Sequence, residues 1–172
     1  MLIRDDLILI ASTDAKGGIG KSSGLLVRIP EDMRHFAGHT IGQTIIIGRK
    51  TLASFKNGVP LPNRMNIVLS NNPDFRVVGA TVVRNLHELF DCLQGVRGRI
   101  YVCGGESVYR SLVGFCSRAI VTRFDLTCDA DAFLPEISRE TGWLCLDNGE
   151  WKMSEKGIRY RIQEYERLVQ GL

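Results

Sequence analysis

The stretch "LILIA", residues Leu7–Ala11, is a continuous apolar run that indicates a strand covered on both faces. A strand with one face in water would instead alternate apolar and polar residues. The same unbroken pattern recurs at five later places in the chain, which are Thr44–Ile47, Asn66–Leu69, Ala80–Val83, Ile100–Cys103 and Ala119–Thr122. Strands of this kind predict a central, mostly parallel and twisted sheet.

Short helical stretches between these strands complete the fold class. They are expected at Pro30–Phe36, Thr51–Phe55, Leu86–Leu93 and Ser107–Val113. Asn85 and Glu88 have the spacing of a capping box at the start of the third helix. The tail differs, because Ile158–Glu164 alternates apolar and polar residues as an antiparallel edge strand does. The sequence therefore predicts a single α/β domain over residues 1–172, with flanking helices and an antiparallel C-terminal edge strand.

Composition and charge narrow the classes of protein. A chain of 172 residues with 44% hydrophobic content can bury one sizeable core. Its 22 basic residues are scattered among 19 acidic ones, so we expect no nucleic-acid partner but allow a local basic pocket for a small anion. No apolar run approaches ~18 residues, and Met1–Asp6 lacks the features of a signal peptide. We expect a cytoplasmic monomer without a membrane partner.

Cysteines and histidines do not predict a metal site. The five cysteines are widely spaced and form no C-x-x-C pair, so we expect reduced core residues. His35 and His39 have the spacing of a metal pair, but Gly38 interrupts the helical turn between them and no glutamate follows His35. We therefore expect no metal.

The glycine-rich segment "DAKGGIGKSS", Asp14–Ser23, resembles a phosphate-binding loop of the Walker type. Such a loop must open a long helix, whereas Gly24 and Pro30 leave no room for one here. A Mg²⁺ site would also need an acidic residue at the end of a later apolar strand. The candidate, Asp125, follows Ala119–Phe124, which has a different sequence pattern. The segment is better interpreted as a flexible loop than as part of a nucleotide hydrolase.

A carboxylate lies on the apolar face of the first expected helix. In "IPEDMRHF", Asp32 falls on the face of Phe36, beside Ile29 and Met33. An acid in the first helical turn can simply complement the helix dipole. Alternatively, a buried carboxylate can bind a cationic or amidine-like ligand edge, and Thr122 at the end of a later strand could supply a hydroxyl.

Two strand-to-helix turns are candidates for phosphate binding. "TIIIGRKT" ends a buried strand at Gly48 and places Arg49, Lys50 and Thr51 at a helix start. "YVCGGESVYR" repeats the arrangement with Gly104 and Gly105. Each could be an ordinary turn by itself. Together they favour a dinucleotide, and the two cations favour one with an extra phosphate, such as NADPH.

The ordered series of these segments resembles the dihydrofolate reductase family from Leu7 to about Arg167. The resemblance is carried by "DAKGGIGK", "RIPEDMRHF", "IGRKT", "PLPNRMNIVLS", "VCGGESVYR", "VTRFD", "DAFLP" and "YRIQEYER". It implies the family's fold and hydride transfer from NADPH to 7,8-dihydrofolate, which gives tetrahydrofolate. It also implies that the glycine segment is a mobile loop over the nicotinamide and not a phosphate cradle.

The resemblance further implies a set of site residues. Asp32 would hold the 2-amino edge of the pterin and support protonation, with Thr122 as its hydroxyl partner. Substrate would be bound by Ile10, Ala11, Val27, Met33, Phe36, Phe55, Leu61, Arg64, Cys103 and Tyr109, with Arg64 on the glutamate carboxylate. Cofactor would be bound by Ile19, Gly20, Gly48, Arg49, Lys50, Thr51, Ser70, Asn71, Arg84, Gly104, Gly105 and Ser107.

The chain departs from the family pattern at two places. Leu25, Leu26 and Val27 stand where the family usually has Leu-Pro-Trp, so the indole that orders a water beside the pterin is missing. Asp131-Ala132 replaces the usual Asp-Thr. We expect weaker dihydrofolate affinity, slower turnover and reduced sensitivity to diaminopyrimidine antifolates. The departures leave open a reductase of another pterin or pyrimidine, or a non-catalytic protein that binds NADPH or folate.

Overall fold

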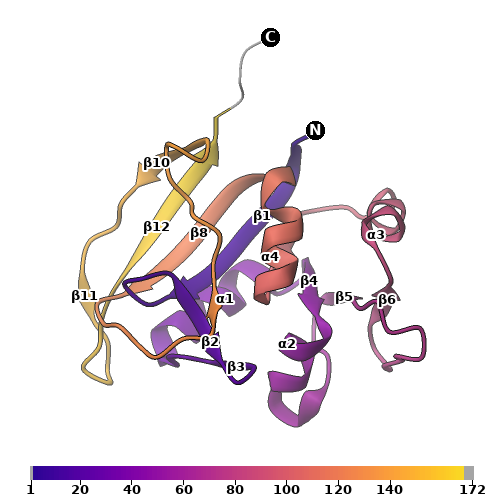
Figure 1. Cartoon of the computed structure of the whole chain (residues 1–172), viewed down its shortest axis with the longest axis horizontal. Helices are drawn as coiled ribbons and strands as arrows, with labels where there is room; N and C mark the ends of the chain where they lie inside the picture. The colour runs from indigo at the N-terminus through magenta and orange to yellow at the C-terminus, as the bar shows by residue number, and fades with distance from the viewer. Residues whose placement is uncertain (1, 169–172) are drawn as a thin grey trace.

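One large sheet dominates the computed structural model of the chain, which describes residues 2–168. Its strands lie in the order β10-β12-β8-β1-β7-β4-β5-β6, and β11 pairs with β12. Their bounds are β1 (Arg4–Thr13), β4 (Thr44–Gly48), β5 (Met65–Leu69), β6 (Thr81–Val83), β7 (Ile100–Val102), β8 (Cys116–Phe124), β10 (Trp143–Asp147), β11 (Lys152–Met153) and β12 (Arg159–Arg167). Figure 1 shows β1 in the middle of this sheet.

The predicted parallel centre of the sheet is confirmed. β1 pairs in parallel with β7 on one side and with β8 on the other. β4 pairs in parallel with β7 and β5, and β5 with β6. Leu7–Ala11 is buried throughout, as expected for a strand covered on both faces.

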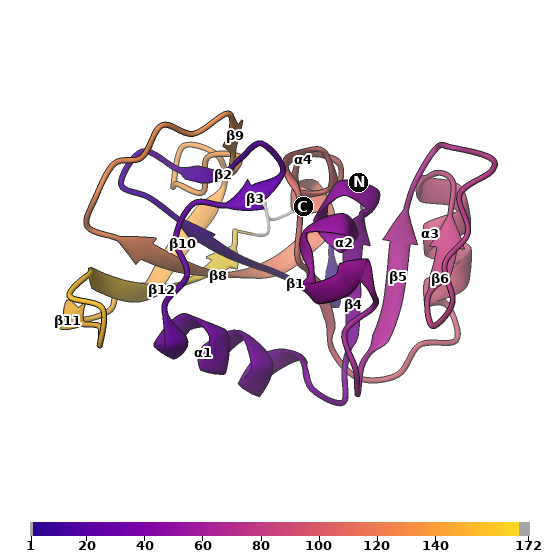
Figure 2. The ribbon, with the colours of Figure 1, turned by 90° about the horizontal axis from the view of Figure 1, so that it is seen from below.

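Helices cover both faces. They are α1 (Pro30–Thr40), α2 (Arg49–Ser54), α3 (Leu86–Leu93) and α4 (Glu106–Leu112), with the short 3-10 helices η1 (Lys56–Gly58) and η2 (Val113–Phe115). Figure 2 shows α1 on one side of the sheet and α4 on the other. On the α4 side, Leu7, Leu9 and Ala11 join a core cluster with residues of α3 and α4. On the α1 side, Ile8 and Ile10 pack in a second cluster.

Hydrogen bonds between residues within four positions of each other hold two helix ends. Asn85 caps α3 as predicted, since its Oδ1 accepts from the Glu88 N–H at 2.9 Å, while the Glu88 carboxylate accepts from the Arg84 N–H at 2.8 Å. α1 runs four residues beyond the predicted end, through Gly38. The Thr40 hydroxyl donates to the Phe36 carbonyl at 2.9 Å and supports this last turn.

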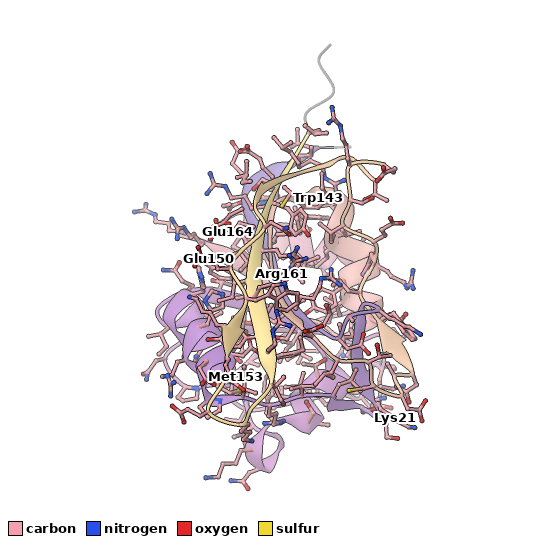
Figure 3. The ribbon with its side chains drawn as sticks, turned by 90° about the vertical axis from the view of Figure 1, so that its left-hand side faces the viewer. Lys21, Trp143, Glu150, Met153, Arg161 and Glu164 are labelled. Atoms are coloured by element: carbon pink, nitrogen blue, oxygen red, sulfur yellow. The ribbon has the colours of Figure 1, made fainter. Side chains whose placement is uncertain are left out.

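The C-terminal strand is antiparallel, as predicted. β12 pairs antiparallel with β8, and β10 and β11 add further antiparallel pairs on its outer side. Figure 3 views the molecule from this edge and shows Trp143 near one end, with Arg161 and Glu164 along β12. Trp143 is fully buried, and the Arg167 guanidinium lies 4.0 Å from its ring centroid.

A second, three-stranded sheet is a feature that sequence patterns did not predict. β2 (Gly18–Lys21) and β3 (Gly24–Leu25) form a hairpin, and β9 (Ala132–Phe133) pairs with β2 on its other edge. These strands are two to four residues long, which is too short for a periodic signal. None of the described helices is long and apolar enough to cross a bilayer.

The cysteine prediction is confirmed in part. All five cysteines lie in the described range and are free. Cys116 is buried, whereas Cys145 is exposed, so the expectation of a core position is wrong for Cys145.

Candidate active site

Asp32 lies where α1 approaches the carboxyl ends of β1 and β8. It is 9% exposed, and its Oδ2 accepts a hydrogen bond of 2.5 Å from the Ser12 hydroxyl. Thr122 on β8 is 2% exposed and is the register partner of Ser12. A carboxylate and two hydroxyls therefore converge at this end of the sheet, which suits a ligand edge with several N–H donors.

A cavity of about 890 Å³ opens at the same end of the sheet. Ser12 lines it and so connects the cavity with Asp32. All the residues expected to bind cofactor, except Gly104, also line it, namely Ile19, Gly20, Gly48, Arg49, Lys50, Thr51, Ser70, Asn71, Arg84, Gly105 and Ser107. The structure therefore brings these distant segments together around one space.

The two glycine turns lie against each other at the floor of this cavity. The Gly48 N–H donates to the Gly104 carbonyl at 2.8 Å. A Cβ at Gly104, where φ is +105°, would lie 2.9 Å from the Tyr109 ring. A Cβ at Gly105 would lie 3.3 Å from the Thr51 hydroxyl. Side chains at these positions would press on Tyr109 and Thr51, so the packing of the two turns favours glycine here.

Positive charge is concentrated on one side of the cavity. Arg49 and Lys50 are exposed in the first turn of α2. Arg84 is used differently, because its guanidinium donates to the Asn72 carbonyl at 2.6 Å and to the Phe75 carbonyl at 2.9 Å. Arg84 thus shapes the turn after β5, while Arg49 and Lys50 are placed for an anionic group.

The glycine loop is a hairpin over the cavity, and the element that follows Lys21 is the strand β3 and not a helix. Lys21 ends β2 and pairs with Asp129. The Ser22 N–H donates to Asp131 Oδ2 at 2.9 Å, and the Asp131 N–H donates to the Gly20 carbonyl at 3.0 Å. This geometry confirms that the segment is not a Walker loop.

A buried carboxylate holds the base of this loop. Asp14 is 1% exposed and accepts from the N–H groups of Lys16 and Gly18 at 2.8 Å and of Cys128 at 2.9 Å. Such bonds satisfy a buried charge and fasten the loop to the segment before β9. A Cβ at Gly18 would lie 2.6 Å from the Cβ of Ala130, so this junction requires glycine.

Most of the apolar residues expected at the substrate share one cluster. Ile10, Phe36, Phe55, Leu61 and Cys103 pack on the α1 side of the sheet. Met33 is 44% exposed beside them on α1. The side chains of Ala11 and Val27 lie elsewhere, since Ala11 packs on the α4 side and Val27 packs with Ile29, Phe124 and Tyr160.

Arg64 lies at the outer end of this apolar cluster. Its Nε donates to the Thr40 hydroxyl at 2.8 Å, and its Nη1 donates to the Pro62 carbonyl at 2.7 Å. The guanidinium also lies 5.8 Å from the Phe36 ring centroid. These contacts fix the plane of a cation whose other N–H groups can bind a carboxylate.

Burial keeps two groups near the junction of the cavity and the cluster uncharged. Burial raises the pKa of the Tyr109 hydroxyl well above its ordinary value, and the neighbouring Cys103 and Asp32 raise it further. Burial likewise raises the pKa of the Cys103 thiol. Tyr109 therefore stays a hydrogen-bond donor, and Cys103 stays a neutral wall residue at neutral pH.

His35 and His39 pack against each other instead of forming a site at the cavity. Their rings meet edge to face at 4.6 Å, and His39 Nδ1 lies 3.3 Å from the Tyr101 hydroxyl. Burial lowers the pKa of both histidines.

Known proteins share this sequence pattern. A sequence model of the family described as dihydrofolate reductase matches residues 6–167. The chain belongs to the dihydrofolate reductase family. It is 38% identical over 162 residues to a dihydrofolate reductase of Mycobacterium leprae, covering 92% of this chain and 96% of that protein. It is 34% identical over 159 residues to that of Bacillus subtilis, covering 92% of each.

A solved structure of the dihydrofolate reductase family has the same fold. It is the enzyme from Enterococcus faecalis complexed with NADP(H) and RAB-propyl. The TM-score is 0.86 at 28% identity, and the match covers 97% of this chain and 99% of that one. The predicted dihydrofolate reductase-like fold is therefore confirmed.

Sequence reasoning missed two polar residues of this dihydrofolate reductase-family site. Ser12 sits in β1 directly after the "LILIA" run, and a polar residue at that place was the available signal. Asp14 opens the glycine-rich segment, where no pattern in the sequence indicates its burial. The hydrogen-bond partners of Ser12 and Asp14 could not be deduced from the sequence, because Asp32 lies 20 residues from Ser12 and Cys128 lies 114 residues from Asp14.

Proposed function

We propose that this chain catalyses the NADPH-dependent reduction of 7,8-dihydrofolate to 5,6,7,8-tetrahydrofolate. Membership of the dihydrofolate reductase family supports this activity. The observation that carries it is the nearly buried Asp32 carboxylate beside a cavity lined by two glycine turns and two exposed cations. A buried carboxylate and a basic cavity together suit a pterin and a phosphorylated dinucleotide.

Asp32 is proposed to act by orientation and electrostatics. Its carboxylate accepts hydrogen bonds from the 2-amino edge of the pterin and stabilises the positive charge that develops when the ring is protonated. Thr122 supplies a hydroxyl on the adjacent strand. Tyr109 remains neutral and serves as a donor in the site wall, because its pKa is raised by burial.

The remaining substrate is proposed to lie along the apolar cluster of the α1 side. Ile10, Phe36, Phe55, Leu61 and Cys103 already pack together there. Arg64 lies at the end of this cluster and binds the glutamate carboxylate with its free N–H groups. For Ala11, Val27 and Met33 we propose contacts at the rim of the pterin site.

The cavity residues fit NADPH. The exposed cations Arg49 and Lys50 would bind the 2′-phosphate with Thr51, and Ser70, Asn71 and Arg84 would lie along the adenosine. Gly48, Gly104, Gly105 and Ser107 would approach the pyrophosphate, since the glycines leave the backbone of both turns without side chains. Ile19 and Gly20 of the hairpin would cover the nicotinamide. When bound, NADPH supplies the hydride.

We also propose that residues 1–172 form one domain that works as a cytoplasmic monomer without a nucleic-acid partner. Five free cysteines suit a reducing compartment. Mixed charges with a net of +3 do not suit a nucleic-acid surface. Size-exclusion chromatography with light scattering tests the monomer, and a mass of two chains would refute it.

Loss of NADPH absorbance on addition of dihydrofolate tests the activity. Wild type should turn over, and Asp32→Asn should lower kcat/KM by about 100-fold or more, because the amide carries no charge to stabilise the protonated ring. Glu31→Gln is the matched control. Glu31 is the neighbouring acid, but its Oε1 accepts from the Glu155 N–H at 2.7 Å, so this variant should keep wild-type activity.

The alternatives give different results in the same assay. NADPH and folate binding without turnover would indicate a non-catalytic binding protein. Turnover with another pterin or a pyrimidine, but not with dihydrofolate, would change the substrate and leave the cofactor in place. Equal losses in Asp32→Asn and Glu31→Gln would contradict the role of Asp32.

A further inference from the structure

Ser12 forms a hydrogen bond with Asp32 to which the proposed function assigns no role. Its hydroxyl donates to Asp32 Oδ2 at 2.5 Å, and the residue is half-buried in the wall of the cavity. A hydrogen bond from a hydroxyl to a carboxylate is charge-assisted and about twice as strong as one between neutral groups. The contact therefore constrains how the carboxylate can turn.

The strand geometry explains why this hydroxyl reaches the carboxylate. Side chains alternate along β1, so Ser12 shares the α1-facing side with Ile8 and Ile10. Ser12 and Thr122 are aligned partners in the parallel β1/β8 ladder. The two hydroxyls thus lie side by side on neighbouring strands, and α1 places Asp32 over Ser12.

We infer that Ser12 is a positioning residue, whose hydroxyl fixes the orientation of the Asp32 carboxylate and leaves its other oxygen directed to the pterin edge. The inference rests on the proposed function. A carboxylate has about four acceptor sites, so one bond from Ser12 leaves capacity for two N–H donors of a substrate. A carboxylate held in place before binding loses less conformational freedom when the substrate arrives.

Two variants of Ser12 test this inference in steady-state assays with dihydrofolate and NADPH. Ser12→Ala removes the donor and should lower kcat/KM for dihydrofolate about tenfold, mainly through KM. The KM for NADPH should stay within about twofold, because Ser12 acts through Asp32. Ser12→Thr keeps a hydroxyl on the same Cβ and should restore kcat/KM to within about threefold of wild type.

Ser117→Ala is the matched control. Ser117 lies near the start of β8, at the opposite end of the strand from Thr122. Its hydroxyl donates to the Asp5 carbonyl at 3.0 Å. This variant should leave both KM values unchanged. Thermal unfolding of every variant separates loss of structure from loss of orientation. The Ser12→Ala and Ser12→Thr variants should have similar Tm values, whereas only Ser12→Thr should have a KM for dihydrofolate close to that of wild type.

The results separate the inference from the proposed function. If wild type does not reduce dihydrofolate, the proposed function fails. If wild type is active, unchanged KM for dihydrofolate in Ser12→Ala overturns the inference. An equal rise in both KM values, or equal losses in Ser12→Ala and Ser12→Thr, also overturns it, since each would indicate a role other than orienting the carboxylate.

Discussion

The Tyr109 hydroxyl on α4 donates a buried hydrogen bond of 2.7 Å to the Ile10 carbonyl on β1, across 99 residues of sequence. This bond joins a helix to the strand that contains "LILIA", at the junction of the cavity and the apolar cluster. Because burial raises the pKa of Tyr109, the hydroxyl remains a donor throughout the neutral range.

Tyr109→Phe should lower the free energy of unfolding by about 1 kcal/mol, because the Ile10 carbonyl loses its donor while packing is kept. Denaturant unfolding measures the change. Tyr160→Phe is a useful comparison, since Tyr160 is also mostly buried but its hydroxyl makes no hydrogen bond within residues 2–168. Similar losses in the two variants would mean that the bond to Ile10 contributes little.

Asp14→Ala should destabilise the protein by about 3 kcal/mol, because three backbone N–H groups lose a charged acceptor. The loop that carries Ile19 and Gly20 should also loosen, so KM for NADPH should rise several-fold. Urea unfolding and steady-state kinetics measure the two effects.

Asp129→Asn provides the contrast on the same hairpin. Its partner Lys21 is exposed, and an exposed ion pair contributes little to stability. Figure 3 shows Lys21 at the corner of the molecule far from Trp143. We expect a nearly unchanged unfolding midpoint, and an effect as large as that of Asp14→Ala would refute the special role of the buried carboxylate.

The His35 and His39 pair should make stability depend on pH on the acid side. Burial lowers the pKa of both in the folded state below the ordinary value of 6.5. The unfolded chain therefore takes up protons first, and the stability present above about pH 6.5 is lost as the pH falls through the lowered folded pKa.

Thermal unfolding between pH 7 and pH 5 measures this effect. We expect Tm to fall by a few degrees over this range in wild type and by less in the His35→Gln, His39→Gln double variant. His87→Gln is the control, because His87 lies exposed beside Asp91. An identical pH slope in the double variant and wild type would exclude the pair as its source.

Val27→Trp should strengthen dihydrofolate binding if the missing indole weakens it. One added N–H donor to a bound water contributes about 1 kcal/mol, which corresponds to about a fivefold lower KM for dihydrofolate. We also expect faster turnover and tighter inhibition by diaminopyrimidines.

Val27→Leu adds volume without a donor and should give none of these gains. Val27 packs against the cluster of Ile29, Phe124 and Tyr160, so both variants need a Tm measurement to check packing. No change in KM, turnover or inhibition with Val27→Trp would contradict the hypothesis that this departure impairs the enzyme.

Short-range patterns in the sequence determined the central strand, the bounds of α3 and one candidate site residue of this protein. The unbroken apolar run at Leu7–Ala11 indicated a doubly covered strand, and the bounds of α3 followed from the Asn85 cap and its apolar stripe. Asp32 stood out because a carboxylate on an apolar helical face needs a partner. Propensity, periodicity and capping act within a few residues, so they can be read along the chain.

Tertiary structure alone decided the contacts that complete the site. The bond from Ser12 to Asp32 depends on where α1 lies over β1, and Thr122 becomes its neighbour only through the pairing of β1 with β8. The β2–β9 pairing likewise depends on distant partners. Hydrogen bonds between residues 20 to 114 positions apart carry no local periodic signal, because their geometry exists only once the sheet has assembled.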